Sequence, residues 1–520
     1  MGLRSFAAAL SLLLAGCVSA PAPIQADLLI RGGTVYPGGA EPFVGDVAVR
    51  GERIVAVGKR LSATAARIID ARGLIVAPGF IDPHAHVESW LTAGEAQKRF
   101  AAPFLLQGVT TTLVGNDGFG PVDVKPLLAS AAARPVGINY AVFTGFGSIR
   151  STVIGDTRRA PTPGELAEER ALVRTALCDG AIGLSTGLFY APQSFAETAE
   201  VVALAQVAGA LGGVYDTHLR DEGSYGAGLA ASVDEAIAIA REARIAVHIS
   251  HIKALGVDVH GQAPTVVAKI ERARAEGLDI TANQYPWQAS GTSLVAALVP
   301  LWAQDGGRAA MLRRFDDPAL RQRLVTEIGE NLRRRGGPAS LVVVEGRWKG
   351  ERLGAIAKQL ALDPVRAAMA AIRAGDAATV SFNMAPADIA TFMRQPWVVT
   401  GSDASTGHPR SYGSYAEKYA VYVRDVKLLT LREFIDRSSA TTARIFNLED
   451  RGRLYPGALA DIVVFDPATY AARATYERPE LTATGVRHVL VNGALAVDNG
   501  AVTGAAAGQA LARRPASGCQ

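Results

Sequence analysis

The chain contains very little cysteine: only Cys17, Cys178 and Cys519 among 520 residues. Cys17 follows a short apolar segment at the N-terminus, so two cysteines remain for the rest of the chain. Small secreted proteins that depend on disulfides for stability carry many more cysteines than this. We therefore expect no disulfide framework, with Cys178 in a helical segment and Cys519 in a disordered polar tail over residues 504–520.

A strong charge of either sign is also absent. The formal net charge is +4, and the lysines and arginines are scattered, with only short clusters such as Arg333-Arg334-Arg335. Proteins that bind nucleic acid usually gather positive charge on one face, so we expect no nucleic-acid partner. Hydrophobic residues make up 49% of the chain and charged residues 20%, which is typical of a globular protein.

No hydrophobic run is long enough to span a bilayer comfortably. The apolar run over residues 6–14 is short, follows a basic residue and precedes small residues, as in a signal peptide. The following LAGC segment (residues 14–17) resembles a bacterial lipobox, which implies lipidation of Cys17 and a membrane anchor on the periplasmic side. An ordinary cleaved signal peptide is the alternative. A valine after the cysteine favours the outer membrane, and residues 1–26 are predicted to be signal peptide plus tether.

Short strands are predicted near both ends of the chain. Residues 27–77 alternate apolar and polar positions between turn signals, and the same pattern returns over residues 447–503. We expect the two segments to form one β unit. Such a unit would bring together the two ends of the central region, residues 78–446.

The central region alternates candidate strands with helical segments. The predicted strands cover residues 75–82, 109–117, 137–145, 181–186, 212–220, 245–253, 279–287 and 397–405. Eight strands alternating with helices indicate an α/β fold, namely a (β/α)8 TIM barrel. The span over residues 293–380 is longer than one crossover helix, so we expect an inserted subdomain there.

Histidines and aspartates gather where the predicted strands end, and these ends form the catalytic face of a (β/α)8 barrel. His84 and His86 can share one face because alternate side chains of a strand point the same way. Each residue alone could be a hydrogen-bonded core or turn residue, but together they suit a metal such as zinc. The candidate ligands are His84, His86, Asp117, His218, His251 and Asp403.

Seven segments occur in an order that resembles a known family. They read GFIDPHAHVES, GAIGLSTGLFYAP, YDTHLRDE, HISHIKALG, NQYPW, GSDASTGHPRSYGSY and RGRLYPGALADIVVFDP. Over residues 27–501 the chain resembles the amidohydrolase superfamily and, within it, the D-aminoacylase (N-acyl-D-amino-acid deacylase) family. The resemblance implies a distorted metal-dependent hydrolase barrel with a small β-sandwich made from both chain ends. It also implies one or two zinc ions and hydrolysis of the amide that joins an acyl group to a D-amino acid.

The resemblance further implies how the ligands divide. His84, His86 and Asp403 would bind one metal ion, and His218 and His251 would bind a second ion more tightly. The family usually has a cysteine ligand in a GNCG segment, whereas this chain reads GNDG with Asp117 at that point. We favour Asp117 as a bridging ligand, harder than a thiolate, over a simple turn residue.

Asp403 is the predicted catalytic residue. A bound metal lowers the pKa of its water, and Asp403 would take that proton and pass it to the leaving amine. The alternative for Asp403 is a helix N-cap. The resemblance places Lys253, Arg410, Tyr190 and Tyr285 around the substrate carboxylate and carbonyl, where an arginine fork suits a carboxylate.

Several alternatives stay open at this point. Trp287 hints at a hydrophobic D-residue or is a packing aromatic, and Arg220 is a further substrate contact or a partner of Asp221 or Glu222. The substrate is a small molecule or short peptide, such as a dipeptide with a C-terminal D-residue. Rival functions are a dipeptidase, a cyclic-amide hydrolase or an inactive lipid-anchored binding protein, and the oligomeric state is open.

Overall fold

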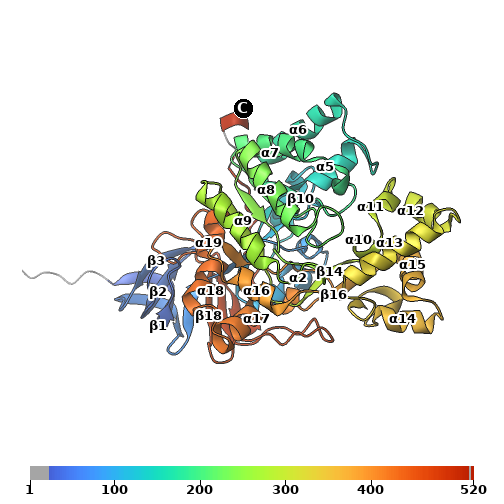
Figure 1. Ribbon diagram of the computed structural model, residues 1–520. Helices are drawn as coiled ribbons and strands as arrows, with labels where there is room; N and C mark the ends of the chain where they lie inside the picture. Colours follow the sequence, from blue (N-terminus) through green and yellow to red (C-terminus); the bar gives the residue numbers. More distant parts are fainter. Residues whose placement is uncertain (1–22, 515–516, 520) are drawn as a thin grey trace, which may run out of the picture.

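The computed structural model describes residues 23–514 and 517–519 (Figure 1). The predicted signal peptide and Cys17 lie outside the described residues. In the described part of the chain, no helix is both long and apolar enough to cross a membrane. The predicted tether is wrong at its C-terminal end, because strand β1 (Ile24–Val35) already begins there and pairs with β4 (Ala63–Asp70).

Strands from both chain ends form one paired sheet, at the left of Figure 1. β5 (Ile75–Pro78) and β18 (Ile462–Phe465) join the two ends as antiparallel neighbours. Apolar side chains of both segments, including Ile30 and Val464, share one buried core, and this confirms the predicted β unit. The other strands are β2 (Phe43–Arg50), β3 (Arg53–Gly58), β19 (Val486–Val491), β20 (Ala494–Asp498) and β21 (Ala501–Val502).

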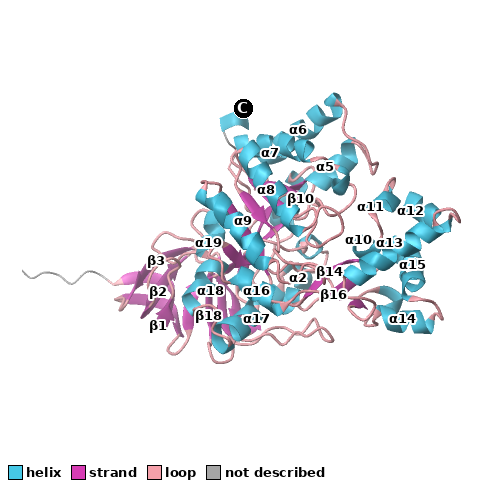
Figure 2. Cartoon of the chain, in the orientation of Figure 1, coloured by secondary structure: helices cyan, strands magenta, loops and turns pink. Residues whose placement is uncertain are grey.

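A barrel of parallel strands forms the centre of the molecule, surrounded by helices (Figure 2). A bridge between Ala85 and Ala404, which follow the first and last strands, closes the circle and confirms the predicted (β/α)8 fold. The predicted strand over 137–145 is divided into β8 and β9. The strands are β6 (Phe80–Asp82), β7 (Val109–Val114), β8 (Asn139–Val142), β9 (Thr144–Gly145), β10 (Gly183–Gly187), β11 (Val214–His218), β12 (Val247–Ile249), β13 (Ile280–Gln284) and β17 (Val398–Thr400).

The helices of the barrel follow local sequence signals. Thr162 and Glu165 form a capping box at the start of α6 (Pro163–Cys178), and Pro163 occupies its first turn, where a missing N–H costs nothing. The longer helices are α4 (Lys125–Ala133), α5 (Phe146–Val153), α6 (Pro163–Cys178), α7 (Thr198–Ala210), α8 (Leu229–Ala243), α9 (Ala263–Ala275), α16 (Pro386–Met393), α17 (Arg410–Glu417) and α18 (Leu431–Ser438). The short ones are α1 (Glu88–Leu91), α2 (Ala96–Arg99), α3 (Ala102–Leu105) and α19 (Ala440–Ile445), and a π-helix (Lys418–Asp425) continues α17.

The predicted insertion is present and has its own hydrophobic core, which includes Leu324, Leu341 and Ile372. β14 (Ala289–Ser293) and β16 (Ala378–Phe382) pair antiparallel at its base, so the insertion spans 289–382 rather than 293–380. It lies at the right of Figure 1. Its other elements are α10 (Leu294–Leu298), α11 (Leu301–Gln304), α12 (Gly307–Asp316), α13 (Arg321–Arg334), β15 (Leu341–Val343), α14 (Leu353–Gln359) and α15 (Pro364–Gly375).

The C-terminal tail differs from its prediction. Gly508 donates to the carbonyl of Val136 at 2.9 Å, and Leu511 donates to the carbonyl of Tyr140 at 2.7 Å. The tail pairs here because β10 contacts only the short β9, which leaves the first half of β8 with unpaired backbone groups. The prediction of a disordered tail is therefore wrong for residues 504–514.

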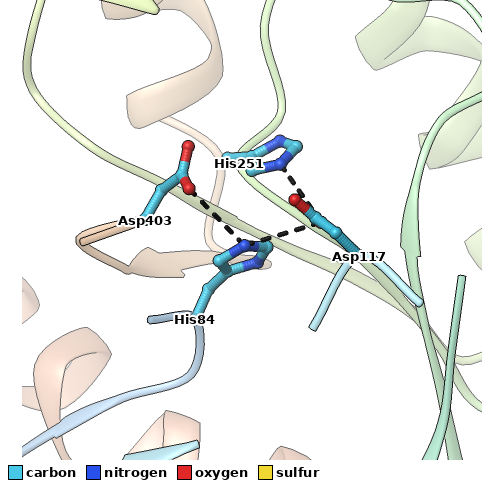
Figure 3. A group of neighbouring side chains, drawn as sticks. All are labelled: His84, Asp117, His251 and Asp403. Atoms are coloured by element: carbon cyan, nitrogen blue, oxygen red, sulfur yellow. Dashed lines mark ion pairs between the residues drawn. The ribbon is translucent and has the colours of Figure 1, made fainter. Parts of the chain in front are cut away.

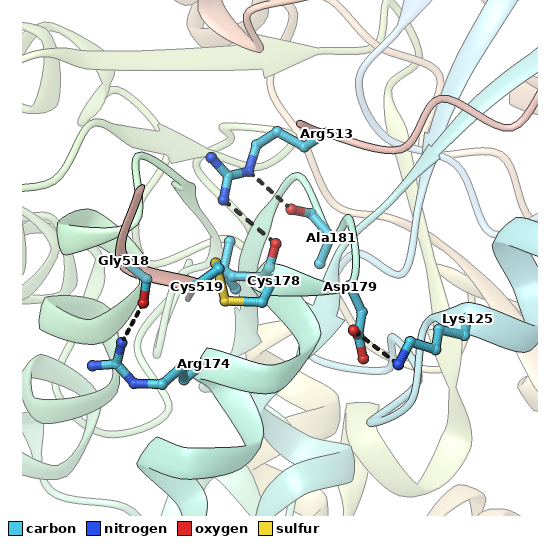
Figure 4. The surroundings of a disulfide bond; sticks show 9 residues. Lys125, Arg174, Cys178, Asp179, Ala181, Arg513, Gly518 and Cys519 are labelled. Atoms are coloured by element: carbon cyan, nitrogen blue, oxygen red, sulfur yellow. Dashed lines mark hydrogen bonds and ion pairs between the residues drawn. A yellow bond between two sulfur atoms is a disulfide. The ribbon is translucent and has the colours of Figure 1, made fainter. Parts of the chain in front are cut away.

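A disulfide between Cys178 and Cys519 attaches the end of the tail to α6 (Figure 4). The sequence analysis expected no disulfide framework, and this one disulfide corrects that expectation. The two residues are 341 positions apart, so no local spacing in the sequence indicates the pair. Gly518 also accepts a hydrogen bond from Arg174 of α6 at 3.3 Å.

Candidate metal centre

The structure brings all six predicted ligands to the mouth of the barrel. Each comes from the C-terminal end of a strand, where the backbone leaves the sheet and its side chains converge. Figure 3 shows four of them around one point. His84 and His86 follow β6, Asp117 follows β7, His218 ends β11, His251 follows β12, and Asp403 follows β17.

One group of donors consists of His84, Asp117, His251 and Asp403, whose ligand atoms all lie within 4.8 Å of one another. His84 Nε2 is 3.5 Å from Asp117 Oδ1 and 3.6 Å from Asp403 Oδ1. His86 Nε2 joins them at 3.4 Å from Asp117 Oδ2 and from Asp403 Oδ1. Two carboxylates and three imidazoles can therefore face one ion.

A second group of donors consists of His218, Glu222 and His251. Glu222 Oε2 lies 3.5 Å from His218 Nε2, and Glu222 Oε1 lies 3.2 Å from His251 Nδ1. Asp117 reaches towards this group as well, with Oδ2 3.8 Å from His218 Nδ1. Asp117 Oδ1 lies 3.5 Å from both His84 Nε2 and His251 Nε2, so the Asp117 carboxylate faces donors of both groups.

Glu222 was missed as a site residue by the sequence analysis. It is buried, and its position four residues after His218 in the segment YDTHLRDE was the available signal. Asp82 and Asp216, which end or lie within strands, were missed too. They support the centre from behind: Asp82 accepts from the backbone N–H of His84 at 3.2 Å, and Asp216 accepts from Ser250 Oγ at 2.8 Å.

The backbone at the centre is held in an unfavourable conformation. Asp117, His251 and Asp403 have φ angles of 56°, 34° and 51°, in the left-handed region that costs L-residues roughly 1–2 kcal/mol. A close neighbour constrains Asp117, because a Cβ at Gly187 would lie only 2.4 Å from the Asp117 carbonyl oxygen. Asp117 therefore occupies a turn and also points its carboxylate at the histidines.

Burial and charge set the protonation of these groups. Burial lowers the pKa of His84 to about 4. Burial alone would lower the pKa of His86 too, but the carboxylates of Asp117 and Asp403 raise it well above its usual value. The pKa of each carboxyl is lowered in spite of burial, by the neighbouring histidines for Asp117 and by Arg410 with the histidines for Asp403. Both stay ionised, which is the state that binds a cation.

The donor set fits a divalent metal ion. Asp117 Oδ1 is buried and has no hydrogen-bond partner among residues 23–514 and 517–519, although buried polar atoms are usually paired. Imidazole nitrogens and carboxylate oxygens are ligands that zinc and similar ions accept. The donors of this centre are therefore arranged to bind a divalent ion rather than to form hydrogen bonds with one another.

A cavity of about 380 Å³ opens in front of these donors. Tyr190, Lys253 and Arg410, three of the four predicted substrate contacts, line it. Arg410 donates to Asp403 Oδ2 at 2.5 Å and to Ser405 Oγ at 2.8 Å, while its buried Nε has no partner among the described residues. Lys253 Nζ contacts Glu222 Oε1 at 2.6 Å and His251 Nδ1 at 2.7 Å.

Tyr285, Trp287 and Arg220 do not line this cavity. The ring of Tyr285 packs 5.3 Å from the guanidinium carbon of Arg410, and its hydroxyl lies 4.0 Å from a methionine sulfur. Trp287 is a packing aromatic that donates to Ser414 Oγ at 3.0 Å. Arg220 pairs with Glu235 at 2.8 Å rather than with the acidic residues that follow it.

Comparisons with known proteins agree with this geometry. The model of the family described as Amidohydrolase family matches residues 67–497. The D-aminoacylase of Alcaligenes xylosoxydans xylosoxydans is 34% identical over 94% of this chain and 98% of its own length. The N-acyl-D-glutamate deacylase of the same organism is 34% identical over 90% of this chain and 93% of its own length.

Solved structures give the same result. An N-acyl-D-glutamate deacylase from Bordetella bronchiseptica, complexed with zinc and a phosphonate inhibitor, superimposes with a TM-score of 0.79 at 30% identity. The alignment covers 94% of this chain and all of that one. A D-aminoacylase structure has a TM-score of 0.80 at 31% identity over the same shares. The predicted resemblance is thus confirmed, and the chain belongs to the amidohydrolase family.

Proposed function

We propose that this protein is a zinc-dependent hydrolase that removes the acyl group from N-acyl-D-amino acids, including dipeptides that end in a D-residue. The assembled His and Asp centre carries the proposal. Five of the six predicted donors, all except His84, line one cavity, and the ligand atom of His84 lies within 4.8 Å of those of Asp117, His251 and Asp403. The chain aligns over 94% of its length with a D-aminoacylase. A binding protein without catalysis would have no need for such a centre.

Two sets of residues would hold one or two zinc ions. His84, His86 and Asp403 form one set, His218 and His251 form the other, and Asp117 faces both. Zinc bound there lowers the pKa of a water and polarises the scissile carbonyl. The buried unpaired Oδ1 of Asp117 is the observation that supports a cation at this point.

Asp403 is the proposed general base and acid. Arg410 holds its Oδ2, so the Oδ1 atom remains on the side of the histidines. Asp403 takes a proton as water adds to the acyl carbon, and it delivers the proton to the amide nitrogen as the C–N bond breaks. The products are a carboxylic acid and a free D-amino acid.

The remaining polar groups of the cavity orient the substrate. Arg410 and Lys253 both line the cavity and both lie over the ring of Tyr285, so this pair of cations is the proposed site of the substrate α-carboxylate. Burial raises the pKa of Tyr190 well above its usual value, which keeps its hydroxyl protonated and able to donate to the carbonyl oxygen. Tyr285 supports the two cations with its ring rather than its hydroxyl.

We also propose that the protein is a lipoprotein on the periplasmic side of a bacterial membrane, anchored through Cys17. Support comes from the LAGC segment and from the disulfide between Cys178 and Cys519, because disulfides persist in oxidising compartments. Radiolabelled palmitate should be incorporated by the full chain and not by Cys17→Ser. Equal labelling of both proteins would contradict the anchor.

The proposed activity is tested with the chain from residue 23, loaded with zinc. Amine release is followed from matched D and L pairs of N-acetyl amino acids and dipeptides. We expect release from the D member only, its loss in Asp403→Asn, and no change in the control Asp425→Asn, whose carboxylate is exposed on the surface. No release from any pair at full zinc occupancy would overturn the proposal and direct attention to cyclic amides.

A further inference from the structure

The insertion supplies a wall of the cavity that the proposed chemistry does not use. Ser290 and Thr292 of β14, Ala296 of α10 and Thr379 of β16 line it. The one fully charged group that the insertion buries there is Arg335, at the C-terminal end of α13. Arg335 is only 2% exposed although it lines a cavity.

Arg335 lacks a carboxylate partner, unlike the other buried arginines in the described part of the chain. Its Nε donates to the Tyr225 hydroxyl at 2.6 Å, while its Nη1 is buried and has no partner among residues 23–514 and 517–519. The remaining buried arginines all pair with a carboxylate: Arg150 with Glu200, Arg410 with Asp403, Arg437 with Glu433 and Arg451 with Asp461.

An unpaired buried guanidinium is costly. Burial of an ion costs several kcal/mol unless a counter-charge and hydrogen bonds compensate it, and arginine cannot escape by losing its proton. Glu345 also lines the cavity, but it is exposed, and no ion pair of the described residues joins it to Arg335. The position of Arg335 therefore points to a counter-charge that the protein itself does not provide.

Arg335 is also separate from the cations assigned to the α-carboxylate. Arg410 is bonded to Asp403, whereas Arg335 packs on Tyr225, whose ring contacts Phe189, and Phe189 in turn contacts His218. Two aromatic rings thus lie between Arg335 and the metal centre. Arg335 and Arg410 share no hydrogen-bond partner in the described chain, so we assign a separate carboxylate to each.

We propose that Arg335 binds a second carboxylate of the substrate, so that the preferred substrates are dicarboxylic N-acyl-D-amino acids. This inference rests on the proposed deacylase function and names its substrate class. The second carboxylate comes either from an acidic D-side chain or from a dicarboxylic acyl group. Both present the same planar anion to the guanidinium fork.

The test compares each acid with a neutral partner of the same shape. N-acetyl-D-glutamate is paired with N-acetyl-D-glutamine, and N-succinyl-D-alanine is paired with N-succinamoyl-D-alanine. We expect the zinc-loaded protein to favour the acid of one pair by about 10- to 100-fold in kcat/KM, as for a hydrogen bond to a charged group. The pair that shows the preference identifies the source of the carboxylate.

Variants connect the preference to Arg335. Arg335→Met should abolish it while activity on the neutral amides stays within a few-fold, which also shows that the variant is folded. Arg335→Lys should restore part of the preference, because it keeps the charge without the fork. Arg333→Met removes the same charge from the same helix end, from a half-exposed side chain paired with Asp258, and should change nothing.

Two results would overturn the inference: no preference in either pair for the unaltered protein, or a preference that survives Arg335→Met. If no compound is hydrolysed, the deacylase function fails, and calorimetric binding of D-glutamate against D-glutamine and of succinate against succinamate replaces turnover. Tighter binding of an acid that is lost in Arg335→Met would still support the carboxylate site. Equal binding by both proteins would contradict it.

Discussion

The two ends of the barrel both bury charged side chains, but they differ in whether the buried polar groups have hydrogen-bond partners. At the base, where the strands begin, Arg451, Asp461, Asn139 and Asn492 satisfy one another. At the mouth, where the strands end, several buried polar atoms have no hydrogen-bond partner in the part of the chain that the structure describes, among them His84 Nδ1, Asp117 Oδ1 and Arg410 Nε. Both ends belong to one fold and one core, so the difference reflects what each end is for.

The base is a closed network. Arg451 pairs with Asp461 and also donates to Asn492 Oδ1 at 2.9 Å. Asn139, at the start of β8, donates to Asp461 at 3.2 Å and accepts from Asn492 at 2.8 Å. The tail joins the network through the backbone N–H of Gln509, 3.0 Å from Asn139 Oδ1. Barrel, β unit and tail are thus tied together by satisfied hydrogen bonds.

The mouth, in contrast, contains buried polar groups without hydrogen-bond partners in the described chain and residues with a strained backbone. Three of its donors have positive φ angles, and Arg335 is buried without a counter-charge. Such features reduce stability and are retained where a ligand compensates for them. The comparison therefore predicts that substitutions at the mouth change activity, whereas substitutions at the base change stability.

The largest effect is expected for Asp403→Asn at the mouth. The amide cannot accept the proton from water, so kcat should fall by about 10²–10⁴-fold, as for the loss of a general acid–base group. The measurement is kcat on the best D-substrate, with zinc content determined for both proteins. Near-normal kcat at equal zinc content would show that another group moves the proton.

The second effect is a loss of stability at the base. Arg451→Met leaves Asp461 buried without its counter-charge, which should destabilise the protein by about 3–5 kcal/mol. A lower midpoint of thermal unfolding with unchanged kcat/KM of the folded protein is expected. Arg453→Met, an exposed neighbour, is the control. A large fall in kcat/KM with an unchanged midpoint would contradict the division of roles between the two ends.

How far the sequence predicts these two ends depends on the kind of signal. The barrel strands and the six donors were predictable, because strand periodicity and polar residues at strand ends are local patterns. Glu222 lies in a loop, and only the path of that loop places its carboxylate between two histidines. Arg335 is one of three consecutive arginines, and the helix end alone determines which of them is buried.

The base was the harder end to predict for the same reason. The tail pairs with Val136, just before β8, and with Tyr140 of β8, along an edge that the short β9 leaves uncovered. The contact between Cys519 and Cys178 depends in turn on the path of that tail. Each interaction links residues hundreds of positions apart, and no periodicity in the sequence records such links.

A third, smaller effect separates the tail from the site. Cys519→Ser removes the disulfide and frees the end of the tail, which should cost about 2–4 kcal/mol of stability. The thermal midpoint should fall under oxidising conditions and should match that of the unaltered protein once both are reduced. An unequal midpoint after reduction would show that the serine acts through packing rather than through the lost bond.

The smallest effect is expected for Asp117→Cys, which tests whether the mouth tolerates a softer bridging ligand. The thiolate can still face both metal sets, so activity should survive, with a preference shifted from harder ions towards zinc. The left-handed backbone at a φ of 56° is less favourable for cysteine than for aspartate, so the free energy of unfolding should fall by about 1 kcal/mol. Activity is measured after reconstitution with zinc, cobalt and manganese, with Asp117→Ala as the control that removes the ligand altogether.

If Asp117→Ala supports the same activity and metal content, Asp117 is a turn residue and the mouth needs no bridging ligand. If only aspartate and cysteine do, the strained backbone at this position exists to present a ligand.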